Sequence, residues 1–354
     1  MQSRSWFFIV IISLFAGLLI AGGTTFIVDP YFHYRAPING LSYSVENADY
    51  ANDGISRNFE YEAMITGPST TTGFKVKEAN ELFGKQFIRI TFLGEGFYRI
   101  GQNVRRAIEY NDNLEMIFWS IDPIWFVTNE KWEGRESYPE YLLNDNRWDD
   151  VNYLLNGQIF FNDTIPEIVR TMKGVLPDNI DQYADCTEGN REIVLSNYQR
   201  SEKLNCTVSD EETNVMKDEL RKNIEENIVS VVKENPDIVF NLYIPPLSIL
   251  WWDELNQSGE ALLMRRIDME QLVIELLVLY ENVQLFSFED ATQIVCDLDN
   301  YYDTVHFSNT VSSYMLSEMK KGNHLLTKDN YMDYLEGIRK FYSSYDYDQL
   351  FGEK

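Results

Sequence analysis

The sequence has few of the residues that bind metals. Its 354 residues include only three cysteines and three histidines, which are His33, His306 and His324. None of these six residues lies at the short spacings that are typical of a zinc site. The sequence therefore predicts no structural zinc, and it indicates no other metal and no cofactor.

Basic residues are also scarce. There are 30 lysines and arginines against 56 aspartates and glutamates, which gives a formal net charge of −26. A chain of this charge is repelled by phosphate backbones and offers no basic patch for a nucleic acid. The composition argues against nucleic-acid binding, while the hydrophobic content of 44% is enough for a sizeable globular core.

Long apolar runs are absent after the first 30 residues. The run from Trp6 to Val28 has no charged residue, and about 20 apolar residues suffice to cross a bilayer as a helix. Arg4 precedes the run, so the positive-inside rule leaves the amino terminus in the cytoplasm and sends the rest of the chain outside. A cleaved signal peptide is the alternative, because residues 21–23 are small.

We therefore predict four segments. They are a cytoplasmic N-terminus (1–5), a transmembrane signal-anchor (6–28), a juxtamembrane segment (29–58) and an extracytoplasmic body (59–354) on the outer side of the cell membrane.

The few cysteines suggest one disulfide. Cys186 and Cys206 flank a polar segment, and an exported chain meets the oxidising conditions in which disulfides persist. A bridge between them would contribute about 3 kcal/mol on the loop-entropy model. Cys296 would then remain unpaired, as a small core residue.

Short apolar runs alternate with helical patterns along the body. We predict strands at 61–67, 87–93, 114–122, 237–246 and 282–288, and helices at 75–83, 96–111, 209–234, 258–280, 308–320 and 328–343. Residues 35–58 are polar and irregular, and residues 123–210 are predicted to be an insertion of helices and loops. This alternation predicts an α/β protein with three layers, α/β/α, around a mostly parallel five-stranded sheet with a flavodoxin-like arrangement.

Polar and small residues follow several of the predicted strands. The first strand is followed by "GPSTTTGF", which contains Ser69, the second by Gly94, the third by Asp122, and the fifth by Asp303 and His306. The carboxyl ends of parallel strands meet at one edge of a sheet. A carboxylate three residues before a histidine can orient the imidazole, which in turn can take a proton from a serine.

The alternative for residues 69–72 is a polar turn without chemistry, because Gly, Pro and small polar residues are ordinary turn formers. If one hydroxyl is reactive, we expect it to be that of Ser69, since Pro68 fixes the turn directly before it. The threonines at 70–72 are expected to cap the following helix.

In this order of motifs the sequence resembles the SGNH/GDSL hydrolase superfamily over roughly residues 60 to 320. Within it, the likeness is to the membrane-anchored cell-envelope members that accompany acyl modification of polysaccharides or teichoic acids. "GPST" stands at the family's nucleophile block and "DTVH" at its Asp-x-x-His block. The resemblance implies that Ser69 is the nucleophile and an oxyanion donor, that His306 is the base and that Asp303 orients it.

The match is less close at two other positions. Gly94 stands where the family has its oxyanion glycine. The family's Gly-x-Asn block is missing, and "WSIDP" offers Asp122 there. As an anion, this side chain would oppose an oxyanion rather than stabilise it.

Two functions follow from the resemblance. The first is a membrane-anchored serine esterase or O-acyltransferase that acts on envelope glycans through a Ser-His-Asp triad. Its expected partners are an acylated glycan, the lipid bilayer and a membrane-bound acyl-donor protein. Trp251 and Trp252 would either form a sugar-stacking wall or fill the core. The second, favoured by the missing asparagine, is a catalytically inactive envelope protein of the same fold that binds glycan or scaffolds a membrane partner.

Overall fold

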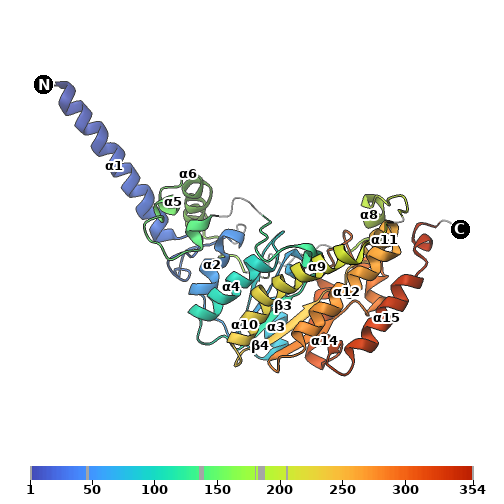
Figure 1. Ribbon diagram of the computed structural model, residues 1–354. Coiled ribbons are helices and arrows are strands. Elements are labelled where there is room, and N and C mark those ends of the chain that lie inside the picture. The colour runs from blue at the N-terminus through green and yellow to red at the C-terminus, as the bar shows by residue number, and fades with distance from the viewer. Residues whose placement is uncertain are drawn as a thin grey trace.

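A six-stranded sheet lies at the centre of the computed structural model, which describes residues 2–44, 48–134, 139–179, 181, 188–204 and 206–352 (Figure 1). The strand order is β2-β1-β3-β4-β5-β6, and β1 to β5 are parallel. The strands are β1 (Ala63–Gly67), β2 (Phe87–Thr91), β3 (Met116–Ser120), β4 (Val239–Ile244), β5 (Val283–Ser287) and β6 (Leu325–Leu326). The α/β class and the five parallel strands predicted from the sequence are confirmed. The sixth strand was missed, because two residues antiparallel to β5 are too short to give a pattern.

The order of the strands reverses at β1. The chain passes from β1 to β2 on one side and then returns to place β3 on the other side. Ligands of open parallel sheets bind outside the carboxyl ends of the strands at such a switch point. The segments that follow β1, β2 and β3 therefore surround the position where a site is expected.

Helices cover both faces of the sheet, which is why nearly all strand residues are buried. On one face α3 (Val76–Phe83) packs against α14 (Asn309–Lys321), and the ring of Phe83 contacts those of Phe87 and Phe118. The other layer is formed by neighbouring helices that follow one another across the sheet (Figure 1). They are α4 (Phe97–Tyr110), α9 (Asp210–Ile224), the π-helical turn η6 (Glu225–Val229), α10 (Ser230–Glu234) and α12 (Glu260–Leu277), with α15 (Tyr331–Ser344) against α12.

Helix α9 begins where the sequence predicted, because Ser209 and Glu212 form a reciprocal capping box. The helix predicted at 258–280 is preceded by another, α11 (Ile249–Ser258), which the sequence reading missed. Gly259 separates α11 from α12 and has a φ of +131°, a conformation that favours glycine.

The polar segment 35–58 was predicted to be irregular, but it contains helix α2 (Ala48–Asn58). This helix packs against α4 and β2 and is held by polar contacts from other elements. Asp53 lies 2.7 Å from Arg57 and 3.2 Å from Arg106, and the Ser56 hydroxyl donates to Asn103. Arg57 belongs to α2 itself, whereas Arg106 and Asn103 belong to α4, which is distant in sequence, so the local pattern gave no signal for these two contacts.

Helix α1 (Gln2–Val28) projects from the body (Figure 1). Within the described ranges it is the one helix long and apolar enough to cross a membrane. Its base packs against the insertion, where the hydroxyls of Thr25 and Thr164 lie 3.3 Å apart. Short helices make up much of the insertion: η2 (Pro123–Val127), η3 (Glu140–Leu142), α5 (Val151–Leu154), α6 (Gly157–Ile159), η4 (Phe160–Thr164), α7 (Ile165–Met172) and α8 (Arg191–Asn197).

Three further short helices lie in the last quarter of the chain. They are α13 (Thr292–Val295), η7 (Leu298–Asn300) and η8 (Tyr347–Phe351).

Candidate active site

A tight turn at the end of β1 places Ser69 at the switch point. Gly67 has a φ of +155°, and a Cβ on it would lie 2.5 Å from Thr71 Cγ2 and 2.7 Å from Ser120 Cβ. Only glycine fits there. Pro68 precedes the 3₁₀ turn η1 (Ser69–Thr71), and its carbonyl accepts a hydrogen bond from the Thr71 N–H. Ser69 is therefore the first residue of a turn that is fixed on both sides.

The neighbouring threonines hold this turn. The Thr70 hydroxyl donates to Asp122 at 3.0 Å, and the Thr72 hydroxyl donates to the Ser69 carbonyl at 2.7 Å. We expected the threonines to cap the next helix, and that expectation was wrong. Helix α3 has Lys75 as its N-cap residue, without a side-chain cap.

Asp303, His306 and Ser69 form one row of hydrogen bonds. His306 Nδ1 lies 2.6 Å from Asp303 Oδ2, and His306 Nε2 lies 2.7 Å from Ser69 Oγ. The backbone N–H groups of Val305 and His306 both donate to Asp303 Oδ1. With the proton on Nδ1, which the carboxylate favours, Nε2 is free to accept the proton of the serine hydroxyl.

The loop that carries His306 is supported from two sides. The ring of Tyr302 is nearly parallel to the imidazole, with an angle of 7° and centroids 5.6 Å apart. The Ser248 hydroxyl donates to the Thr304 carbonyl at 2.6 Å. The contact with Ser248 ties the loop between η7 and α14 to the segment that follows β4.

Asp303 is held in its ionised form. Burial raises the pKa of its carboxyl, but the hydrogen bonds from the His306 ring and from the His306 and Val305 N–H groups outweigh this and leave the pKa below its ordinary value. The side chain is 45% exposed, so water screens part of its charge. Asp303 is thus an anion at neutral pH that both orients and stabilises a protonated His306.

Two backbone N–H groups near Ser69 are available to an anion. Gly94 lies in the turn after β2 with a φ of +71°, and this turn is tied to that of β1 by the bond from the Phe92 N–H to the Gly67 carbonyl. In the described part of the chain, the N–H groups of Ser69 and Gly94 donate no hydrogen bond. Paired backbone donors at strand ends are the usual components of an oxyanion hole.

Asp122 is fully buried at the end of β3. Its carboxylate accepts hydrogen bonds from the Thr70 hydroxyl and from the Ile124 N–H. Burial raises the pKa of Asp122, while these two hydrogen bonds act in the opposite direction. The carboxylate is therefore engaged with the turn that carries Ser69, a positioning role that sequence reasoning missed.

The two tryptophans proposed as a sugar-stacking wall are not equivalent. Trp252 is completely buried, and its ring stacks on that of Tyr342 at 3.6 Å. It has no exposed face for a sugar, so Trp252 fills the core, which is the second of the two roles predicted for it and excludes the first. Trp251 is half-buried, and its role stays a prediction.

A different aromatic pair lies beside the turn after β2, which contains Gly94 and Gly96. The rings of Trp125 and Trp132 are 4.7 Å apart, and a Cβ on Gly96 would meet Trp132 at 3.1 Å. Both tryptophans are half-buried and come from the segment after β3. Sequence reasoning passed over them, although the place of Trp125 shortly after β3 was a usable signal.

A buried charged cluster lies behind the site. Arg266 donates to Glu270 at 2.8 Å and to Glu289 at 2.5 Å, and its guanidinium lies over the rings of Phe126 and Trp251. Burial, together with the neighbouring Glu270 carboxylate, raises the pKa of Glu289 well above its ordinary value. One guanidinium is therefore shared by two buried carboxyl groups, which suits a structural cluster.

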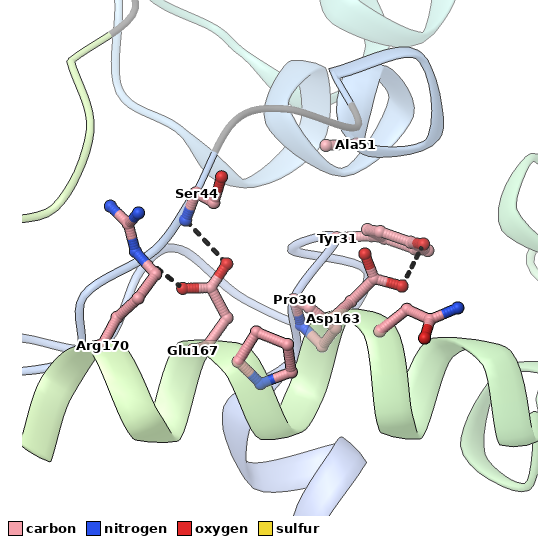
Figure 2. A pocket seen from close by; sticks show the side chains of 9 residues that line it. Pro30, Tyr31, Ser44, Ala51, Asp163, Glu167 and Arg170 are labelled. Carbon is pink, nitrogen blue, oxygen red and sulfur yellow. Dashed lines mark hydrogen bonds and ion pairs between the residues drawn. The ribbon is translucent and has the colours of Figure 1, made fainter.

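A small cavity of about 100 Å³ lies far from these residues in sequence, beside helix α7. Figure 2 shows Glu167 between the Ser44 backbone, whose N–H donates to it at 2.6 Å, and Arg170 at 3.9 Å. Burial raises the pKa of Glu167 to about 7. A cavity of this size holds a few waters rather than a glycan.

The cysteines cannot all be placed. Cys186 lies outside the described residues, so its bridge to Cys206 stays a prediction. Among the described residues Cys206 is exposed and forms no disulfide, and Cys296 is half-buried. The described residues also contain no cluster of three or more histidine, cysteine, aspartate or glutamate side chains suited to a metal.

Comparison with known proteins gives one weak likeness. No family model and no curated protein matches the chain. One solved structure, described as "a putative platelet activating factor from Streptococcus pneumonia", is 14% identical with a TM-score of 0.36, and the match covers 82% of this chain and 92% of that one. Because this score is too low to support an argument, the function has to be inferred from the residues themselves.

Proposed function

We propose that the chain is a membrane-anchored serine esterase or O-acyltransferase of the SGNH type that acts on acylated glycans of the cell envelope. The observation that carries this proposal is the row of hydrogen bonds from Asp303 through His306 to Ser69. It is supported by the position of the row at the switch point of the sheet.

The proposed reaction begins with attack of Ser69 Oγ on the acyl carbonyl carbon. His306 Nε2 takes the hydroxyl proton, and Asp303 stabilises the imidazolium that forms. The carbonyl oxygen, now an oxyanion, accepts from the N–H groups of Ser69 and Gly94. The intermediate collapses, the alcohol leaves with the proton from His306, and the acyl group stays on Ser69.

The acyl group then leaves by the reverse route. Water, or a sugar hydroxyl in the case of transfer, gives its proton to His306 and attacks the acyl-serine carbonyl. Asp303 again stabilises the imidazolium. His306 returns the proton to Ser69 Oγ as the second product is released.

The membrane helix and the aromatic pair fit this role. Helix α1 would keep the body close to envelope polymers and to a membrane-bound acyl donor, which raises their effective concentration. Trp125 and Trp132 present rings beside the turn after β2, where a sugar ring can stack.

A fluorophosphonate probe tests the nucleophile. The purified full chain should be labelled, and so should Thr70→Val and Thr72→Val, whereas Ser69→Ala should not be labelled. Thr72→Val is the matched control, because it removes a hydroxyl from the same turn without removing the proposed nucleophile. Labelling that survives in Ser69→Ala would refute the assignment.

The second candidate is a catalytically inactive envelope protein of the same fold that binds glycan or scaffolds a membrane partner. The observation that favours it is Asp122, which stands where the SGNH family has an oxyanion-donating asparagine. If the wild-type chain takes up no probe and hydrolyses no acetyl or p-nitrophenyl ester, this second function replaces the first.

A further inference from the structure

The groove between α1 and α5 has the features of a lipid-binding site. It has a volume of about 680 Å³ and is lined mainly by apolar side chains of α1 and of the segment around α5. From α1 it includes Leu18, Leu19 and Phe26, and from the other wall Val151, Leu154 and Leu155. Sites for small ligands have volumes in this range, about 300 to 1,000 Å³.

The length of α1 places this groove at the edge of the bilayer. Residues 6–21 of α1 rise about 24 Å at 1.5 Å per residue, which is less than the hydrocarbon thickness of about 30 Å. The next turn of α1 must therefore also lie at the outer edge of the hydrocarbon. In that turn a Cβ on Gly22 would lie 3.0 Å from Leu155, so α5 is at the same depth.

The exposed side chains on the wall of the groove fit this depth. Trp148 is 91% exposed, and Val151 and Leu155 are also exposed. Tryptophan is enriched at the boundary between lipid and water, and a group of exposed apolar side chains marks a surface that lipid or a partner covers.

A cationic group stands beside the groove. Arg147 lines it with a side chain that is 59% exposed, and its guanidinium lies 5.3 Å from the centre of the Tyr34 ring. The guanidinium of Arg35 also lies near the Tyr34 ring, 6.0 Å from its centre. Two guanidinium groups therefore lie at one tyrosine beside the groove, where Asp150 is the acidic lining residue, and guanidinium N–H donors suit a phosphate.

Arg147 is not fully neutralised by the protein. Among the described residues it pairs with Asp150 at 3.6 Å, and Asp150 is shared with His33 at 3.1 Å. A guanidinium has five N–H donors, so donors remain for a ligand.

We propose that this groove binds one lipid of the outer leaflet, with an acyl chain between α1 and α5 and a phosphate headgroup at Arg147. The proposal rests on the membrane-anchor part of the proposed function and is independent of the chemistry at Ser69. It adds a second contact between the body and the bilayer beside the transmembrane helix, and it fixes the orientation of the body on the membrane surface.

The full chain in phosphatidylglycerol vesicles tests the proposal. The probes are a phosphatidylglycerol and a phosphate-free diacylglycerol, each with the same photoreactive acyl chain. Labelling is measured on the peptide that contains α5. Flotation of the wild-type chain with the vesicles is measured first, and a chain that does not float overturns both the anchor and the groove.

Two glycines of α1 provide matched variants. Gly23 lines the groove, and a Cβ on it would meet no atom within 4 Å, so Gly23→Leu adds a side chain that occupies the groove. Gly17 also has open space but does not line the groove, so Gly17→Leu is the control. Gly23→Leu should reduce α5 labelling by about tenfold, the equivalent of losing roughly two buried methylenes, and Gly17→Leu should not change it.

Arg147 tests the headgroup. Arg147→Gln should reduce labelling by the phosphatidylglycerol probe by about tenfold, as expected for a lost hydrogen bond to a charged group, and should leave labelling by the diacylglycerol probe unchanged. Equal labelling of wild type and Gly23→Leu would refute the proposal that a lipid occupies the groove. An equal loss of labelling by both probes in Arg147→Gln would refute the proposal that Arg147 binds the phosphate.

Discussion

Replacing Asp303 by asparagine isolates the contribution of its charge and of the imidazole tautomer. An asparagine oxygen can still accept the two backbone N–H groups of Val305 and His306, so the turn should be preserved. The amide group would then face His306 Nδ1 and donate to it. His306 would carry its proton on Nε2, the nitrogen that has to accept the proton of Ser69.

The structure sets the size of the effect. Opposite charges 4 Å apart attract by about 1 kcal/mol in water and about 4 kcal/mol in a partly shielded site, which corresponds to a rate change of about 5-fold to 10³-fold. The value for Asp303 should lie between these limits, because its side chain is 45% exposed. The wrong tautomer adds to this loss, with an upper limit of about 10⁴-fold known for a buried triad aspartate. We expect kcat to fall by about 10² to 10⁴ and KM to change little.

The assay is hydrolysis of p-nitrophenyl acetate by the full chain in detergent, with thermal unfolding as a check on folding. Asp290→Asn is the matched control, because Asp290 contacts His324 Nδ1 at 2.7 Å in a second Asp–His pair that has no serine. It should keep normal activity. A loss of less than about threefold in Asp303→Asn would be below the weakest Coulomb effect and would refute the role of the carboxylate.

Two further predictions concern stability. Gly67→Ala should lower the free energy of unfolding by about 2 to 4 kcal/mol through backbone strain and overpacking. Gly337→Ala is the control and should not destabilise the protein, because a Cβ on Gly337 would meet no atom within 4 Å. Equal melting temperatures for the two variants would contradict this prediction. Glu167 has a folded-state pKa raised to about 7 from 4.5, so unfolding releases its proton and stability falls as the pH rises from about 4.5 through 7. Glu167→Gln should therefore raise the melting temperature at pH 8 but not at pH 4, with an upper limit of about 3 kcal/mol; a gain that is the same at both pH values would count against the pKa shift.

The parallel core was readable from the sequence because its signals are local. Each predicted strand is a short apolar run, and all five form strands within a few residues of the predicted bounds. The motifs after these strands were then placed by a general rule of parallel sheets. Ser69, Asp303 and His306 lie in contact although 234 or more residues separate the serine from the other two.

Features that depend on distant polar contacts were not readable. Helix α2 has only Ala51 and Ile55 as buried apolar residues, too few to give a clear pattern, and its Asp53 pairs with Arg106 of a distant helix. Trp251 and Trp252 are adjacent in sequence, but the side chain of only one stacks on Tyr342 of the last long helix. Neither the ion pair of Asp53 with Arg106 nor the difference in burial between Trp251 and Trp252 can be predicted from the local sequence.

Asp122 shows how a local rule and a tertiary contact lead to different interpretations of one residue. In the sequence it is a carboxylate in the place of an amide donor, which suggests repulsion of an oxyanion. In the structure both carboxylate oxygens are engaged, one by the Thr70 hydroxyl and one by the Ile124 N–H. On our proposal the Asp122 side chain then holds the nucleophile turn, and the backbone donors of Ser69 and Gly94 carry the oxyanion alone. Since one oxyanion donor is worth about 10² to 10³ in rate, this argues for an enzyme with modest turnover rather than for an inactive one.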